Sequence, residues 1–189
     1  MNEQEKMLQK GFRYLNRFMV LMYRLGMAPL INCFPTLLGQ IMILNHTGRK
    51  SGKKYQSGLN FYEQDGNIYC AAGFGSGSDW YRNITANPTV EVWVNNHWHS
   101  CTVEEIENNK DNLHLMRQVL ICSGFAAYAA GINPRKLSDD ALFDAVSTYR
   151  LMRLKRVEAR TGNGGPGDLA WINALLVMML LPALFRKKK

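Results

Sequence analysis

The segment HTGRKSGKK, residues 46–54, gathers five side chains that are cationic or can become cationic around two glycines. Gly48 and Gly52 let the backbone turn sharply and present N–H groups outward. Arg49 and Lys50 add positive charge, and a guanidinium can hold a phosphate through two hydrogen bonds. The segment lacks the Walker pattern. It therefore predicts either a turn that binds an anionic group or an ordinary solvated hairpin turn.

A second candidate site is the glycine-rich segment GFGSGSDWYRNITANP, residues 73–88. Ser78 or Asp79 can cap a short helix after the glycines. Backbone N–H groups at a helix N-terminus bind anions. Trp80 and Tyr81 would add aromatic rings beside them, which suits a planar cofactor with a phosphorylated tail. The alternative is a hairpin loop that carries two core aromatic residues.

The segments around both motifs are typical of strands. We predict strands at 40–46, 55–63, 67–72, 89–94, 97–105 and 150–157. Asp65-Gly66 and Asn95-Asn96 favour two-residue hairpin turns, and the second turn places Trp93 opposite Trp98. We predict further helices at 110–122 and 138–148, the second capped by Ser138. This pattern indicates antiparallel strands in a barrel or a strongly curled sheet, with flanking helices.

The two terminal segments are candidates for membrane contact. The periodicity of apolar residues in 3–25 predicts an amphipathic helix, with basic side chains roughly opposite its apolar face. The apolar face consists of Leu8, Phe12, Leu15, Met19 and Met22. Residues 169–185 are almost wholly apolar and precede four basic residues. Each segment fits a helix at an anionic membrane surface or a helix packed on the domain. The apolar segment, without a polar face, favours the membrane.

Composition narrows the class of protein. A chain of 189 residues suits one domain with its own core. The net charge of +8 suits an anionic partner, but its division between the termini and one turn disfavours nucleic acid. His97 and His99 share a strand face, yet no carboxylate or thiolate completes a metal site, so none is expected. With no secretory signal apparent, we expect a cytoplasmic protein, peripheral to or anchored at the membrane.

Together the two motifs resemble those of the deazaflavin-dependent nitroreductase family of split β-barrel oxidoreductases. That family shows T-T-G-R-K-S-G and later a glycine-containing loop leading to W-Y-x-N-x-x-A-N-P-x-V. The matching residues are Trp80-Tyr81, Asn83, Ala86-Asn87-Pro88 and Val90. The resemblance covers about residues 10–158. Where the family continues P-R-x-T-P-L, residues 54–59 read KYQSGL, so the arginine and both prolines are missing.

The resemblance implies a mainly β, α+β fold: a six-stranded antiparallel split β-barrel at 31–160. An amphipathic helix at 1–30 precedes it; a glycine-rich linker at 161–168 and an apolar helix at 169–189 follow it. The expected cofactor is the deazaflavin coenzyme F420, with FMN or FAD as alternatives. The expected reaction is hydride transfer to an electron-poor, lipophilic acceptor such as a quinone or nitro compound, which requires no catalytic acid or base.

The resemblance also assigns site residues. Arg49, Lys50 and Ser51 would hold the phosphate tail, and Lys54 (or Lys53) would replace the missing arginine. The loop and the aromatic residues after it would surround the cofactor: Gly73, Phe74, Gly75, Ser76, Gly77, Ser78, Trp80 and Tyr81. Phe125 and Tyr128 would cover the substrate side, with core packing as the alternative for both.

A rival interpretation is a non-catalytic carrier or sensor, because related split barrels also bind flavins, haem or biliverdin. Barrels of this type often form dimers, so the sequence is compatible with both a monomer and a homodimer. An enzyme should turn over with an electron donor, whereas a carrier should bind its cofactor tightly and never reoxidise it.

Overall fold

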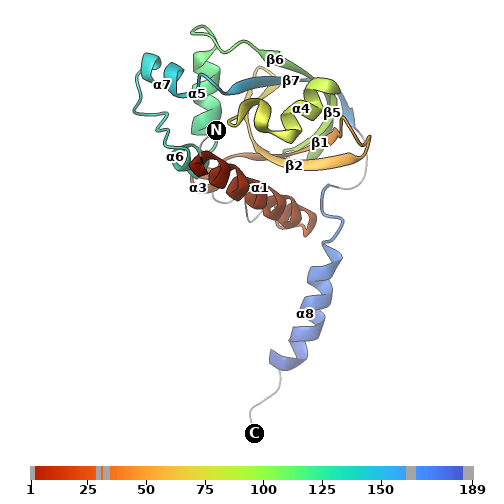
Figure 1. The fold of residues 1–189 in the computed structure, drawn as a ribbon. Helices are drawn as coiled ribbons and strands as arrows, with labels where there is room; N and C mark the ends of the chain where they lie inside the picture. The colour runs from red at the N-terminus through yellow and green to blue at the C-terminus, as the bar shows by residue number, and fades with distance from the viewer. Residues whose placement is uncertain (1–2, 29–30, 32–34, 161–164, 185–189) are drawn as a thin grey trace.

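The computed structural model describes residues 3–28, 31, 35–160 and 165–184, and its fold is mixed α+β. Parts of the predicted linker and basic end, residues 161–164 and 185–189, lie outside the described residues. The centre is a seven-stranded sheet with the order β2-β1-β5-β6-β7-β4-β3. The sheet is strongly curled, with helices around it (Figure 1). Every pairing in it is antiparallel. The strands are β1 (Ile41–Thr47), β2 (Lys54–Asn60), β3 (Tyr62–Gln64), β4 (Asn67–Ala72), β5 (Thr89–Val94), β6 (His97–Ile106) and β7 (Arg150–Arg160).

The sheet curls until its two outer strands meet. β2 and β3 lie at opposite ends of the strand order, yet only Phe61 separates them in the chain. The Phe61 side chain is buried in the barrel core, and its N–H donates to the Gln40 carbonyl at 3.1 Å. The predicted single strand at 55–63 is therefore wrong. The chain changes partner from β1 to β4 at Phe61, which gives seven strands instead of six.

Both predicted hairpin turns are confirmed. Asp65 and Gly66 have φ of 51° and 74°, and Asn95 and Asn96 have φ of 51° and 65°. These left-handed conformations at both central positions match the twist of the flanking strands. The second turn pairs Trp93 with Trp98, and their ring centroids lie 5.4 Å apart. The barrel interior is filled mainly by aliphatic side chains from the strands, with Ile84 of α4 (Asp79–Ala86) covering it.

Three further helices pack on one side of the barrel and form a second core with β4 and β7 (Figure 1). They are α5 (Leu113–Ile121), α6 (Phe125–Ala129) and α7 (Asp139–Ala145). α5 and α7 confirm the predicted helices, and Ser138 Oγ accepts a hydrogen bond from the Ala141 N–H at 3.3 Å, as expected of a cap. α6 and the short α3 (Pro35–Leu38) were not predicted. α6 follows Gly124, whose φ of 56° favours glycine.

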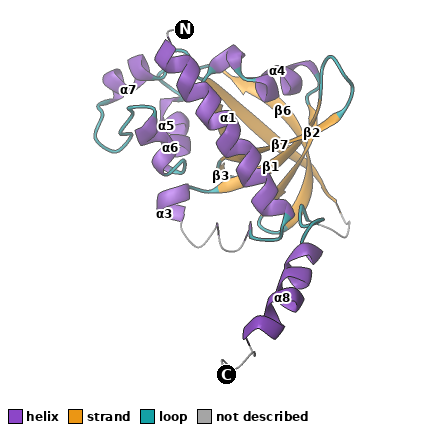
Figure 2. Cartoon of the chain, turned by 60° about the horizontal axis from the view of Figure 1, so that its bottom comes forward, coloured by secondary structure: helices purple, strands orange, loops and turns teal. Residues whose placement is uncertain are grey.

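α1 (Glu3–Arg24) lies along the curled sheet (Figure 2). Met19 and Tyr23 are buried against Ile43 and Trp98, so the predicted apolar face packs on the domain. Asn16 exchanges two hydrogen bonds with the Gly58 backbone, donating to its carbonyl at 2.8 Å and accepting from its N–H at 3.3 Å. These bonds satisfy the Gly58 N–H and carbonyl on the outer edge of β2, where another strand could otherwise pair.

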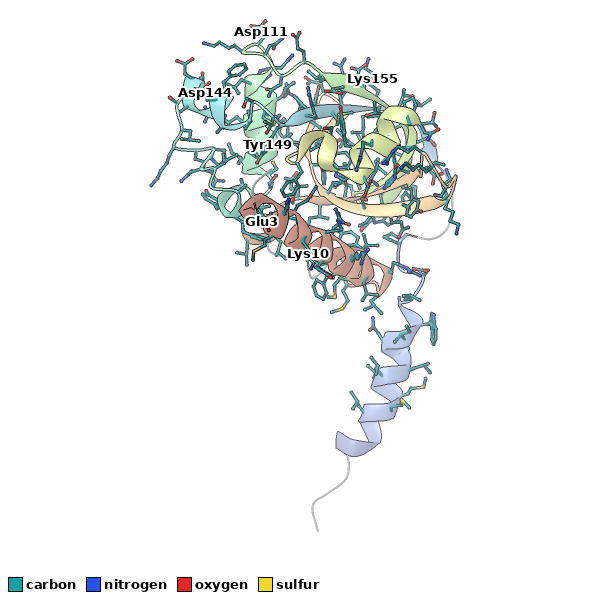
Figure 3. All side chains as sticks on the ribbon, in the orientation of Figure 1. Glu3, Lys10, Asp111, Asp144, Tyr149 and Lys155 are labelled. Atoms are coloured by element: carbon teal, nitrogen blue, oxygen red, sulfur yellow. The ribbon has the colours of Figure 1, made fainter. Side chains whose placement is uncertain are left out.

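α8 (Trp171–Leu184) begins against the end of α1 and extends away from the barrel (Figures 1 and 3). Asp168 pairs with the Arg24 guanidinium at 2.6 Å, the Leu169 N–H donates to the Arg24 carbonyl, and Asn173 Nδ2 donates to the Leu25 carbonyl. Beyond these contacts, the large apolar side chains of residues 175–180 on α8 are 45–78% exposed. No helix within the described residues has the length and hydropathy to cross a bilayer.

Candidate active site

A groove of about 1200 Å³ runs between α1, the β1–β2 turn, the glycine loop and the α5–α6 segment. It brings together most of the predicted site residues: Arg49, Lys50, Ser51, Gly73, Phe74, Gly77, Ser78, Trp80 and Phe125. The predicted residues that do not line it are Lys54, Gly75, Ser76, Tyr81 and Tyr128. Both motifs, which start 27 positions apart in the chain, therefore contribute to one concave site.

The β1–β2 turn is tight because of its glycines. The Gly48 N–H donates to the Lys53 carbonyl and the Gly52 N–H to the Gly48 carbonyl, both at 2.8 Å. A side chain at position 48 would meet the Tyr55 ring at 2.5 Å, and Gly52 has a φ of +65°. Lys50 is exposed at the rim of the groove. The turn thus holds a lysine ammonium group beside the groove.

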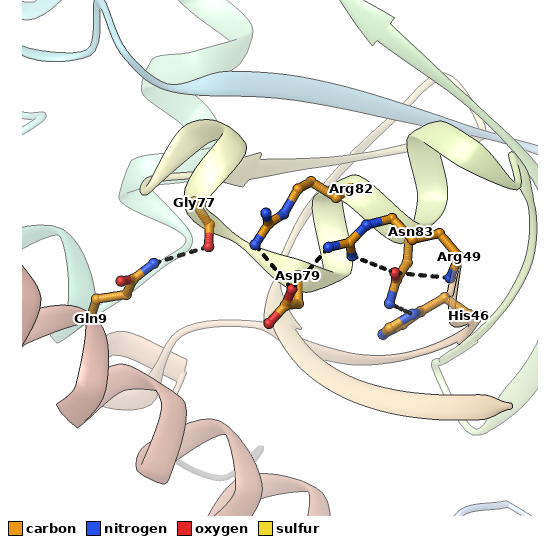
Figure 4. Close-up of polar contacts among 7 residues, drawn as sticks. All are labelled: Gln9, His46, Arg49, Gly77, Asp79, Arg82 and Asn83. Atoms are coloured by element: carbon orange, nitrogen blue, oxygen red, sulfur yellow. Dashed lines mark hydrogen bonds and ion pairs between the residues drawn. The ribbon is translucent and has the colours of Figure 1, made fainter. Parts of the chain in front are cut away.

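Arg49 ties this turn to α4 (Figure 4). Asn83 Oδ1 accepts from Arg49 Nη1 at 2.9 Å and from the Arg49 backbone N–H at 3.2 Å. Asp79 Oδ1 accepts from Arg82 at 3.0 Å and lies 3.5 Å from Arg49 Nη2. Two guanidinium groups therefore offset the carboxylate of Asp79, which would otherwise oppose an anionic ligand. In the sequence, Asn83 stands out only as part of the motif, and its role in joining the turn to α4 depends on the contact with Arg49.

His46 sits behind Arg49 and is only 3% exposed. Its Nδ1 lies 3.2 Å from Asn83 Nδ2, its Nε2 lies 3.1 Å from Ser57 Oγ, and its ring stacks on Tyr55. Burial lowers the pKa of His46 to about 4, against a weaker opposing effect of Asp79. The imidazole is therefore neutral at physiological pH.

Acidification is expected to destabilise the protein through His46. The unfolded imidazole titrates near 6.5 and the folded one near 4. The unfolded state thus binds more protons between these values, and the free energy of unfolding falls as pH falls through this window. The full effect is about 3 kcal/mol. Denaturant unfolding from pH 7 to 4 should show a smaller loss for His46→Gln than for wild type. Equal losses would contradict the assignment.

The glycine loop uses two of the backbone amides that were expected to face a ligand. Residues 75–77 form a single 3-10 turn, in which the Gly77 N–H donates to Phe74 and the Ser78 N–H to Gly75. Ser78 occupies the predicted N-cap position of α4, but its side chain makes no capping bond. The N–H groups of the first turn of α4 lack helical acceptors and are the ones that can bind a ligand.

α1 forms a wall of the groove, which the sequence did not predict. Gln9 Nε2 donates to the Gly77 carbonyl at 3.0 Å, and the Phe12 ring meets Phe74 edge-on at 5.8 Å. Leu8 and Leu15 line the groove beside Phe12. The periodicity of residues 3–25 fits both a helix at a membrane surface and one packed on the domain, because nothing local marks which part of the barrel it covers.

The aromatic residues divide between groove and core. Trp80 lines the groove, but Tyr81 is buried in the barrel core, where its hydroxyl donates to Glu105 at 2.7 Å. Burial is the main cause that raises the pKa of Tyr81. Tyr149, just before β7, lines the groove and packs against Gly73, with ring atoms 3.3 Å from where a Cβ would lie. Tyr128 is 48% exposed, outside the groove.

These residues fit a planar ring with an anionic tail. The groove, at about 1200 Å³, is as large as or larger than common ligand pockets of roughly 300–1,000 Å³, so its size suits a large cofactor. Arg49 and Lys50 line it at the β1–β2 turn, Arg13 and Arg17 line it on α1, and aromatic rings from Phe74, Trp80 and Phe125 line it elsewhere.

Comparison with known proteins identifies the family. Residues 15–137, about two thirds of the chain, match the family model described as F420H(2)-dependent quinone reductase. No curated protein matches the chain significantly.

Solved structures are similar at low identity. They include an F420-H2 dependent reductase (FDR-A), at 22% identity over 61% of this chain and 94% of that one, with a TM-score of 0.44. The heme storage protein HutZ from Vibrio cholerae is 14% identical over 69% of this chain and 90% of that one, with a TM-score of 0.44. From the family match, the chain belongs to the F420H(2)-dependent quinone reductase family and is a reductase that uses coenzyme F420.

Proposed function

We propose that this reductase transfers a hydride to a lipophilic, electron-poor acceptor such as a quinone. The observation that carries the proposal is a single groove in which the cations Arg49 and Lys50 of the β1–β2 turn are joined to apolar side chains of α1: Leu8, Phe12, Leu15 and Met19. When bound, the reduced deazaflavin supplies the hydride. The protein's own part is to bind the reactants, hold them close together and keep water out.

Each wall of the groove has a distinct role in this proposal. Arg49 and Lys50 hold the anionic tail of the cofactor through charge-assisted hydrogen bonds. Trp80 and Phe74 offer aromatic surface to a planar ring. Leu8 and Leu15 of α1 exclude water and suit an apolar acceptor better than a charged or sugar-like one.

We also propose that the protein works at an anionic membrane surface. α8 exposes apolar side chains around its circumference, and an unpartnered apolar helix is costly in water. Such a helix lowers its free energy by lying among lipid chains at the interface. A quinone dissolved in the bilayer would then be close to the groove.

The outer face of α1 has side chains that also suit contact with an anionic membrane. Met7, Tyr14, Phe18 and Leu21 are 44–74% exposed and follow one another at steps of seven, four and three residues, which places them on one stripe. A basic row borders this stripe on the helix: Lys6, Lys10, Arg13 and Arg17. Apolar side chains beside cations are the pattern of a helix that binds anionic lipid.

Turnover is the test of the proposed reaction. Full-length protein with reduced coenzyme F420 is expected to oxidise it when a water-soluble quinone is added, and a nitroaromatic acceptor tests the alternative substrate class. Oxidation is followed by cofactor absorbance, with FMN in place of F420 as the control. Tight F420 binding without oxidation by any acceptor would favour the carrier interpretation and overturn the reductase mechanism.

A further inference from the structure

The orientation of the Asn83 carboxamide is fixed by its neighbours. Its oxygen contacts two groups of Arg49, the backbone N–H at 3.2 Å and Nη1 at 2.9 Å. Both groups can only donate. The carboxamide nitrogen must therefore face His46 Nδ1, which lies 3.2 Å away (Figure 4).

This orientation fixes the tautomer of His46. The Asn83 NH₂ donates to Nδ1, so Nδ1 carries no hydrogen and the ring proton sits on Nε2. Nε2 lies 3.1 Å from Ser57 Oγ. The imidazole therefore donates to the serine oxygen, and the serine accepts. The four residues are linked in one direction, from the guanidinium to the hydroxyl.

The hydroxyl proton of Ser57 is then left for another acceptor. Ser57 lies on β2, lines the groove and is 9% exposed. Among the described residues, His46 Nε2 is the hydroxyl's one hydrogen-bond partner, because the nearby hydroxyls of Ser51 and Tyr55 pair with each other at 3.1 Å. The structure therefore gives the Ser57 proton no protein acceptor among these residues. A buried donor without an acceptor costs free energy, which a ligand in the groove can recover.

We propose that Arg49, Asn83 and His46 form a one-way hydrogen-bond relay that holds Ser57 as a donor to an uncharged oxygen of the bound deazaflavin. The acceptor is a carbonyl of the ring or a hydroxyl of the sugar-like chain next to it. This inference rests on the proposed function, because it takes the groove as the cofactor site. Ser57 binds the ligand, while His46 and Asn83 position it.

The relay itself is tested in the cofactor-free protein. Nitrogen-15 NMR of the histidine rings at pH 7 is expected to show His46 neutral with its proton on Nε2. In Asn83→Asp, the carboxylate accepts from Nδ1–H, so the proton should move to Nδ1 or the ring should become charged. A wild-type ring with the proton on Nδ1 would overturn the relay without any assay of activity.

Ligand binding tests the role of Ser57. The probe is the deazaflavin riboside without its phosphate tail, which limits the effect of the charge introduced at position 83. Ser57→Ala and Asn83→Asp should each weaken riboside binding about 10-fold, in line with one lost hydrogen bond. The double variant should be no weaker than either single variant. The matched control is Ser100→Ala on β6, outside the groove, which should bind as wild type does.

The outcomes separate this inference from the proposed function. Lys50→Ala should weaken binding of F420 but not of the riboside, because it removes a contact to the tail alone. Unchanged riboside binding by Ser57→Ala overturns the donor role even if the wild type binds F420. A wild type that binds neither molecule overturns the cofactor site and the Ser57 contact together, whatever tautomer His46 has.

Discussion

Replacing Arg49 and Lys50 together with alanine is expected to weaken binding of coenzyme F420 about 100-fold and to flatten its salt dependence. Each hydrogen bond between a cation and an anionic oxygen contributes about 1.5–3 kcal/mol, and two of them correspond to at least two powers of ten in affinity. Salt screens such pairs, so the wild type should lose affinity with added salt more steeply than the variant. Fluorescence titration at two ionic strengths measures both effects.

The same turn supplies the control. Lys53 and Lys54 are exposed, carry the same charge and do not line the groove. Their double alanine variant should bind F420 nearly as the wild type does. Lys50→Ala alone separates the charge from the structural role of Arg49, which also holds Asn83. Equal weakening by the two double variants would mean that net charge, and not the groove, controls affinity.

The second large effect is expected at α8. Changing Leu176, Met179 and Leu180 to glutamine should weaken binding to anionic vesicles about 1000-fold, because each large apolar side chain contributes about 1.5 kcal/mol or more when buried. These side chains are 51–78% exposed in the protein. Their replacement should therefore leave the melting temperature unchanged. Vesicle co-sedimentation and thermal unfolding are the two measurements.

Val157→Gln provides a matched control, because Val157 is 64% exposed on β7, on the barrel rather than on α8. This variant should bind vesicles as the wild type does. Uncharged vesicles should bind the wild type less well than anionic ones if the basic row of α1 contributes. Undiminished sedimentation of the α8 variant would rule out this helix as the membrane contact.

Local signals in the sequence predicted much of the fold. Asp65-Gly66 and Asn95-Asn96 encode their turns through the left-handed conformations that asparagine, aspartate and glycine accept. Ser138 encodes a helix start through its own side-chain bond. The prediction that the two motifs lie in one site depended on the family resemblance, because neither segment alone indicates which segment lies beside it.

The features that were missed depend on contacts between distant segments. Trp80 and Tyr81 are adjacent aromatic residues, and only the packing of α4 decides that the first lines the groove and the second fills the core. The role of Asn83 depends on the hydrogen bond that it accepts from Arg49, 34 positions earlier. The wall formed by α1 depends on where Gln9 meets Gly77. Periodicity within a single element carries none of this information.

The single-residue joint at Phe61 restricts where the chain can vary in length. Its neighbours belong to the two outermost strands, so extra residues there would have to be accommodated where the barrel closes. A new chain terminus at that point would release both outer strands and expose unpaired backbone that other chains could extend. Circular permutation and tag insertion should therefore use solvent-facing hairpin tips such as Asp65-Gly66 and leave this joint intact.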